Sequence, residues 1–205
     1  PHVFLLESVE GGEKWARYSF LGTDPRLIFR VQGAEVVIEE NGVVQRIPHG
    51  GDPLRFLKGL LDRCRPVPME GLPRFFGGAV GFLGYDMVRY FERLPAGKGE
   101  APVDDEAVFL VTDTLLIFDN VRHTLKVVAC ATIGEGENLK ESYDGAVRRI
   151  EAMTSILQSP LIVKSESVKR MEQMRKSAPP FRSNMTPEVF MAMVRKAQEY
   201  IVAGD

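Results

Sequence analysis

The chain is poor in cysteine and has no cysteine pair at metal-binding spacing. Only two cysteines, Cys64 and Cys130, occur among 205 residues, and no CxxC motif contains either of them. Disulfide frameworks and structural zinc sites need clustered cysteines, so both are excluded. Each cysteine lies in an apolar or amphipathic run. We therefore expect two reduced thiols in the core of a cytoplasmic protein.

Net charge and long apolar runs are also lacking. The 26 basic and 28 acidic residues give a net charge of −2, and the two signs alternate along the chain. A nucleic-acid or anionic-membrane surface needs clustered Lys and Arg, so neither partner is expected. No apolar run approaches the ~20 residues that cross a bilayer, and no signal peptide is recognisable. The composition, 44% hydrophobic, indicates a soluble globular protein with a sizeable core.

Known catalytic and metal-binding motifs are missing as well. There is no GxSxG elbow and no HExxH helix. The three histidines, His2, His49 and His123, lie far apart without ligand spacing, so we expect them to be solvated at the surface. The acidic residues 104–106 could hold a cation, but an acidic loop is more often simply solvated. No catalytic constellation and no metal site are therefore predicted within this chain.

A glycine cluster at residues 77–84 stands between a predicted strand and a predicted helix. Its spacing is neither GxGxxG nor GxxxxGK[ST], and no lysine follows it to meet a phosphate. Glycine within a strand more often marks the close approach of another backbone. We therefore interpret the cluster as structural.

Alternating β-branched and aromatic runs predict most of the strands. They cover residues 2–7, 16–21, 25–31, 34–40, 43–47, 75–83, 107–118 and 124–132. Asn41-Gly42 predicts a type I′ hairpin, because both residues tolerate positive φ. Asp119-Asn120 is expected to join the last two strands.

Four helices are predicted between and after these strands. One begins at Asp52-Pro53 and ends before Pro66; others cover residues 85–94 and 139–157; the last starts at the N-cap Thr186. Helices and strands do not alternate regularly, which indicates an α+β fold. We expect a regulatory domain over 1–158, a linker or crossover over 159–183, and over 184–205 the first helix of a following domain.

The opening hairpin gathers the most chemistry. Glu7 and Ser8 end a strand that looks buried, and Lys14 and Arg17 follow a Gly-Gly turn. A carboxylate, a hydroxyl and two cations beside aromatic residues suit a small aromatic zwitterion, with Glu7 for its ammonium and Lys14 or Arg17 for its carboxylate. Exposed hairpins commonly mix such residues, so an ordinary hairpin stays the alternative at this point.

Four segments, in order, resemble the large subunit (component I) of anthranilate synthase, within the chorismate-utilising enzymes. LLESVEGGEKWARYSFLG, residues 5–22, is similar to the family's LLES…RYSF(I/L)G signature. GGAVGFLGYDMVRYFERLP, residues 77–95, resembles its GG-x-VGY-x-x-YD-x-VR-x-x-E block. DTLLIFDN, residues 113–120, resembles its second long strand, and residues 183–205 resemble the helix that leads into the chorismate-binding domain. The resemblance covers essentially the whole chain.

The resemblance implies a fold and a function. The fold is α+β, with two orthogonally packed, mainly antiparallel sheets flanked by helices. The complete enzyme is a cytoplasmic lyase that converts chorismate to anthranilate and pyruvate, the first step of tryptophan biosynthesis. Its ammonia comes from a glutamine amidotransferase subunit (component II). The chorismate pocket and its Mg²⁺ ligands follow the Ala-Gly-Asp at which this sequence stops, so we expect an inactive N-terminal fragment without a cofactor of its own.

The resemblance also implies half of a tryptophan feedback site. Glu7 and Ser8 would contact the inhibitor, Lys14 would contribute, and Leu6 would supply a wall. Arg17, Tyr18 and Ser19 would lie nearby. The family's site is completed by its C-terminal chorismate-binding domain, so the fragment alone would bind tryptophan weakly or not at all.

Two alternatives stay open from the sequence. One is the large subunit of aminodeoxychorismate synthase, which shares the fold and acts in folate synthesis. The other is a stand-alone amino-acid-binding regulatory module. Against the module, the last helix carries an apolar stripe (Phe190, Met193, Val194, Ala197 and Ile201) that runs to the end of the sequence and needs a covering surface.

Overall fold

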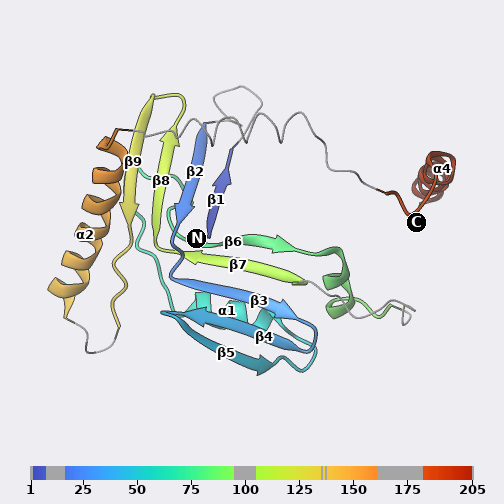
Figure 1. Cartoon of the computed structure of the whole chain (residues 1–205), viewed down its shortest axis with the longest axis horizontal. Coiled ribbons are helices and arrows are strands. Elements are labelled where there is room, and N and C mark those ends of the chain that lie inside the picture. The colour runs from blue at the N-terminus through green and yellow to red at the C-terminus, as the bar shows by residue number, and fades with distance from the viewer. Residues whose placement is uncertain are drawn as a thin grey trace. The chain divides into compact units, whose positions relative to one another are not determined.

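The computed structural model describes residues 2–7, 17–94, 105–134, 136, 138–160 and 182–204. The chain divides into two compact units, Pro1–Ser159 and Pro160–Asp205, and each is described by itself. The first unit contains two antiparallel sheets and the second contains one helix, α4 (Figure 1). Most of the expected linker over 159–183 lies outside the described residues, so that domain assignment stays a prediction.

The larger sheet has five antiparallel strands. Its order is β5 (Val43–Pro48), β4 (Glu35–Glu40), β3 (Leu27–Gln32), β7 (Ala107–Thr112) and β6 (Gly78–Leu83). The predicted hairpin between β4 and β5 is confirmed, since Asn41 has φ 51° and Gly42 has φ 77°. Side chains of one sheet face, among them the completely buried Phe29 and Val31, form the core.

Helix α1 (Leu54–Asp62) packs on that face. Asp52 Oδ1 accepts a hydrogen bond from the Arg55 N–H at 3.2 Å, which satisfies one of the free N–H groups of the first turn. The predicted leucine face is confirmed: Leu57 is buried, and the other leucines of the stripe pack against the same core. The helix ends at Asp62, earlier than Pro66 required.

The glycine cluster has a structural role. At Gly81 in β6 a β-carbon would lie 2.7 Å from Cα of Phe109 on the neighbouring strand β7. The Gly84 N–H donates to the Glu106 carbonyl at 2.7 Å and so continues the contact. Beyond it, the predicted helix over 85–94 is wrong in kind and length, because the chain forms a 3₁₀ helix, η1 (Tyr85–Tyr90).

The smaller sheet has four antiparallel strands. Its order is β1 (Val3–Leu6), β2 (Tyr18–Thr23), β8 (Thr114–Asp119) and β9 (Thr124–Ala129). Figure 1 shows its strands running across the direction of the strands in the five-stranded sheet. The α+β fold with two crossed antiparallel sheets, expected from the resemblance, is therefore confirmed.

One predicted strand is in fact two. The single strand expected over 107–118 is wrong, because Asp113 separates β7 of one sheet from β8 of the other. Hydrogen bonds hold this corner: Thr112 Oγ1 donates to the Thr114 carbonyl at 2.9 Å, and Thr114 Oγ1 donates to Asp113 Oδ1 at 3.0 Å. Both strands are apolar, so their pattern did not reveal the change of sheet.

Helix α2 (Leu139–Gln158) lies beside β9, the strand at the other end of the order from β1 (Figure 1). The Asn138 side chain caps it by accepting from the Lys140 N–H at 3.0 Å. The predicted helix over 139–157 is thus confirmed. Ala146 is its one residue in the buried class; Tyr143, expected on the apolar face, is exposed.

Helix α4 (Pro187–Ala203) forms the ordered part of the second unit. Thr186 accepts from the Val189 N–H at 3.4 Å, and Gly204, with φ 94°, ends the helix in the left-handed region. Both features fit the expected caps. Its apolar stripe is exposed, including Phe190 at 57% and Ile201 at 72%.

Candidate functional site

The expected inhibitor contacts lie at the end of β1. Leu6 is 43% exposed and pairs with Phe20 of β2, and Glu7 follows it with an exposed side chain. The strand was expected to be buried, but it lies at one end of the strand order and its residues are largely exposed. The other two site residues, Ser8 and Lys14, lie outside the described residues. The structure therefore brings Leu6 and Glu7 together and leaves the rest of this site a prediction.

Arg17, which directly precedes β2, is bound to the end of β8. Its Nε donates to Asp119 Oδ1 at 3.2 Å and its Nη2 donates to Asp119 Oδ2 at 2.9 Å. The guanidinium also lies over the Tyr18 ring, 4.8 Å from the ring centroid. We had expected Lys14 or Arg17 to receive a ligand carboxylate. Because Asp119 already holds the Arg17 guanidinium through two hydrogen bonds, Lys14 is the better candidate.

Asp119 is a rigid partner for this arginine. Its side chain is 1% exposed and also accepts the Arg122 N–H at 3.1 Å, within the turn between β8 and β9. The hydrogen bonds from Arg17 lower the pKa of Asp119 to about 2, against the effect of burial, which raises it. Asp119 is therefore ionised at neutral pH and ties the start of β2 to this turn.

Two further contacts join β2 to the same turn. The Asn120 N–H donates to the Arg17 carbonyl at 2.7 Å, and the Asn120 side-chain amide donates to Ser19 Oγ at 3.3 Å. Ser19 is only 6% exposed, so its hydroxyl supports the turn from inside the sheet. The three residues expected near the inhibitor, Arg17, Tyr18 and Ser19, thus form the base of the hairpin.

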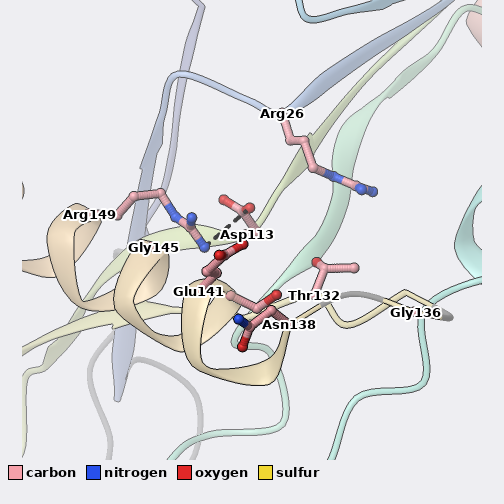
Figure 2. A pocket seen from close by; sticks show the side chains of 9 residues that line it. Arg26, Asp113, Thr132, Gly136, Asn138, Glu141, Gly145 and Arg149 are labelled. Atoms are coloured by element: carbon pink, nitrogen blue, oxygen red, sulfur yellow. Dashed lines mark ion pairs between the residues drawn. The ribbon is translucent and has the colours of Figure 1, made fainter.

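A polar recess of about 690 Å³ lies where the two sheets meet α2 (Figure 2). Arg149 of α2 points into it, with Nη2 3.6 Å from Asp113 Oδ2. The same side chain donates from Nε to Thr114 Oγ1 at 3.2 Å and from Nη2 to the Cys130 carbonyl at 2.7 Å. The lining residues are Arg26, Asp113, Thr132, Gly136, Asn138, Glu141, Ser142, Gly145 and Arg149.

The charges around this recess pair within the protein. Arg149 is held as described, and Arg26 lies 3.8 Å from Glu40. A small-molecule site usually combines apolar walls with a few polar groups, whereas every side chain here is polar or absent. We therefore assign the recess to the corner of the fold, where Arg149 connects α2 to both sheets. The sequence offered one signal, the polar Asp113 inside an apolar run.

A second recess, of about 740 Å³, lies between α1 and the β4–β5 hairpin. Its walls combine apolar side chains such as Ile38 and Leu60 with the charged Arg55 and Arg63. No residue of the expected inhibitor site lines it.

Two expectations about isolated polar residues need correction. His49 was expected at the surface but is 4% exposed. Its Nδ1 accepts the Gly51 N–H at 3.0 Å, which leaves Nε2 to donate to the Gly33 carbonyl at 2.7 Å. Cys64 was expected in the core but is exposed, while Cys130 is half-buried. The local pattern misled in both cases because burial depends on what packs over a loop.

The acidic loop before β7 makes pairs within the protein. Asp105 Oδ2 lies 3.4 Å from Arg30, and Glu106 Oε2 accepts the Tyr90 hydroxyl at 2.8 Å. Among the residues that the structure describes, no group of three or more His, Cys, Asp or Glu side chains could hold a metal. Searched over the same residues, no helix is both long and apolar enough to cross a membrane.

The fold and the site define an α+β protein with crossed antiparallel sheets and a hairpin of binding character at one sheet edge. The family model described as chorismate binding enzyme matches residues 4–205. The chain therefore belongs to the chorismate-binding enzyme family.

Individual relatives bear a more particular name. The chain is 36% identical over 207 residues to "Anthranilate synthase component 1" of Acetivibrio thermocellus, covering 98% of this chain and 40% of that protein. It is 34% identical over 207 residues to the protein of that name in Pseudomonas putida, covering 100% and 41%. The "Probable anthranilate synthase component 1" of Schizosaccharomyces pombe is 34% identical, with 100% and 37% covered. The chain thus spans well under half the length of these relatives.

A solved structure agrees on the fold. The crystal structure of anthranilate synthase component I from Streptococcus pneumoniae TIGR4 matches with a TM-score of 0.60. The match covers 97% of this chain and 40% of that one, at 24% sequence identity. At this identity the likeness supports the architecture and no residue role.

Proposed function

We propose that this chain is the N-terminal part of an anthranilate synthase component I and carries part of its tryptophan feedback site. One observation carries the assignment: relatives named component 1 match at 34–36% identity over 98–100% of the chain. This name also favours tryptophan synthesis over the folate pathway of aminodeoxychorismate synthase. A family match over residues 4–205 argues against a stand-alone regulatory module.

In this proposal the complete protein is a cytoplasmic lyase. It converts chorismate to anthranilate and pyruvate, with ammonia supplied by a glutamine amidotransferase, component II. The Mg²⁺ ion and the residues that hold it belong to the chorismate-binding part, which the resemblance places after residue 205. The described residues fit that division, because none of their acidic side chains gather into a metal site. This chain therefore contributes structure and regulation, and we derive no catalytic step from it.

The feedback site would use the exposed end of β1. Glu7 is exposed there and would accept hydrogen bonds from the ammonium group of tryptophan, and Leu6, 43% exposed, would lie against the indole ring. Ser8 and Lys14 complete this half by resemblance, with Lys14 facing the carboxylate. The chorismate-binding domain would supply the other half. Feedback inhibition would then follow from tryptophan joining the two parts in a conformation that disfavours catalysis.

The activity is tested on the full-length protein. Incubated with chorismate, ammonium and Mg²⁺, it should produce fluorescent anthranilate and pyruvate, and with glutamine it should require the amidotransferase subunit. The 205-residue chain alone should produce neither product. Formation of aminodeoxychorismate without anthranilate would support the folate enzyme. If the full-length protein does not consume chorismate, the enzyme assignment is wrong.

The regulatory role is tested by isothermal titration of tryptophan into the full-length protein. Removing a hydrogen bond to a charged group costs about 1.5–3 kcal/mol, so Glu7→Gln and Ser8→Ala should each weaken binding about tenfold or more. Glu151→Gln is the matched control: Glu151 is an exposed carboxylate on α2, which lies beside β9 at the far end of the sheet from β1. Unchanged affinity in the Glu7 and Ser8 variants would remove this site assignment.

A further inference from the structure

The end of β1 depends on β2 for its position. β1 has one partner strand in the described part of the chain, and Leu6 pairs with Phe20 of β2. Arg17 lies three residues before Phe20, about 10 Å along an extended strand. Whatever holds Arg17 therefore also holds the part of β2 that supports Leu6 and Glu7.

Arg17 is held by an anchor that belongs to another part of the chain. Asp119 lies 102 residues away in sequence and is 1% exposed. Its partner strand contact is direct, since Tyr18 and Asp119 are opposite one another in the ladder between β2 and β8. Two parallel hydrogen bonds between a guanidinium and a carboxylate fix orientation as well as distance. The pair is thus a fixed point at the base of the hairpin.

We propose that Arg17 and Asp119 are positioning residues for the effector site, setting tryptophan affinity through the register and orientation of β2 beneath Leu6 and Glu7. The inference rests on the proposed function. The pair acts without touching the effector, because the guanidinium Nε and Nη2 both donate to Asp119. It differs from an ordinary surface ion pair in that Asp119 is buried and also accepts the Arg122 N–H, at 3.1 Å.

The experiment measures tryptophan binding to the full-length protein by isothermal titration, well below the unfolding temperature. Arg17→Ala and Asp119→Asn should each raise the Kd roughly tenfold, the range typical of residues that modulate a site they do not touch. The double variant should have the Kd of the single variants, since the two residues act as a unit. Combining Arg17→Ala with Glu7→Gln should likewise weaken binding less than the product of the separate effects, because Arg17 acts through the position of Glu7.

Arg149→Ala separates positioning from general loss of stability. Arg149 also donates to a residue of β8, Thr114, but at the other end of that strand from Asp119. It should lower the unfolding temperature and leave the Kd for tryptophan unchanged. Should Arg17→Ala fail to fold, Arg17→Lys keeps the charge, loses the paired hydrogen bonds and is measured with the same expectation.

Two failures are distinguishable. If the wild-type protein does not bind tryptophan, the proposed function and this inference are both overturned. If Glu7→Gln weakens binding while Arg17→Ala behaves like Arg149→Ala, only the inference is overturned. Fully additive effects of Arg17→Ala and Glu7→Gln would also overturn it.

Discussion

Gly81 of β6 and Phe109 of β7 face each other so closely that a β-carbon on Gly81 would lie 2.7 Å from Cα of Phe109. The same added atom would come even closer to the Val108 carbonyl oxygen. Backbone cannot move aside as a side chain can, so this pairing requires glycine. The glycine-rich block thus brings the last strand of the five-stranded sheet into contact with its neighbour.

The first prediction concerns this contact. Gly81→Ala should lower the free energy of unfolding by at least about 1–3 kcal/mol, the cost of overpacking. Gly59→Ala is the control: Gly59 lies within α1 and a β-carbon there would meet nothing within 4 Å. It should raise stability by about 0.5–1 kcal/mol through helix propensity. Urea unfolding followed by circular dichroism measures both, and equal values would contradict the role given to Gly81.

A second prediction uses Tyr90, whose hydroxyl donates to Glu106 Oε2 at 2.8 Å and to the Gly33 carbonyl at 3.0 Å. Burial, then the hydrogen bond to Glu106 and its charge, raise the pKa of Tyr90 from 10.0 to about 12. A raised pKa means that its stabilisation is complete below pH 10 and is lost as the pH rises through 12.

Tyr90→Phe should therefore cost about 0.5–1.5 kcal/mol at neutral pH, the net value of a hydrogen bond. The difference in unfolding free energy between wild type and variant should shrink between pH 10 and 12. Denaturant titrations at several pH values measure it. A difference that stays constant through this range would show that Tyr90 ionisation is not linked to folding.

The third prediction concerns acid. Because the pKa of Asp119 is lowered from 3.8 to about 2, its contribution is present above pH 3.8 and is lost as the pH falls through 2. Asp119→Asn should unfold at a lower temperature than wild type at neutral pH, and the two should converge toward pH 2. Calorimetry across this range tests the pair, and parallel curves would contradict it.

The fourth prediction concerns the corner between the sheets. Arg149→Ala removes the hydrogen bonds to Thr114 Oγ1 and the Cys130 carbonyl, and should cost about 1–3 kcal/mol of stability. Arg148→Ala, at an exposed neighbouring position of α2, should change stability by less than about 0.5 kcal/mol. If urea unfolding gives the two variants the same stability, α2 is not held to the sheets through Arg149.

The binding site divides in the same way as the fold between what was predictable and what was not. Glu7 and Leu6 were found through a short motif, because their relation is local in the chain. The Arg17–Asp119 pair joins residues 102 positions apart, and no periodicity or spacing connects them. Arg17 was accordingly considered for the ligand, whereas the fold gives it to Asp119.

Local chemistry decided much of the architecture. The Asn41-Gly42 turn, the strand alternation around it, the caps of α2 and α4 and the glycines of β6 act over a few residues and could be read in order along the chain. Tertiary structure alone decided the change of sheet at Asp113, the burial of His49 and the pairing of Arg17. The physical reason is that hydrogen-bond partners and burial come from segments distant in sequence, whereas turn and cap preferences belong to the residues themselves.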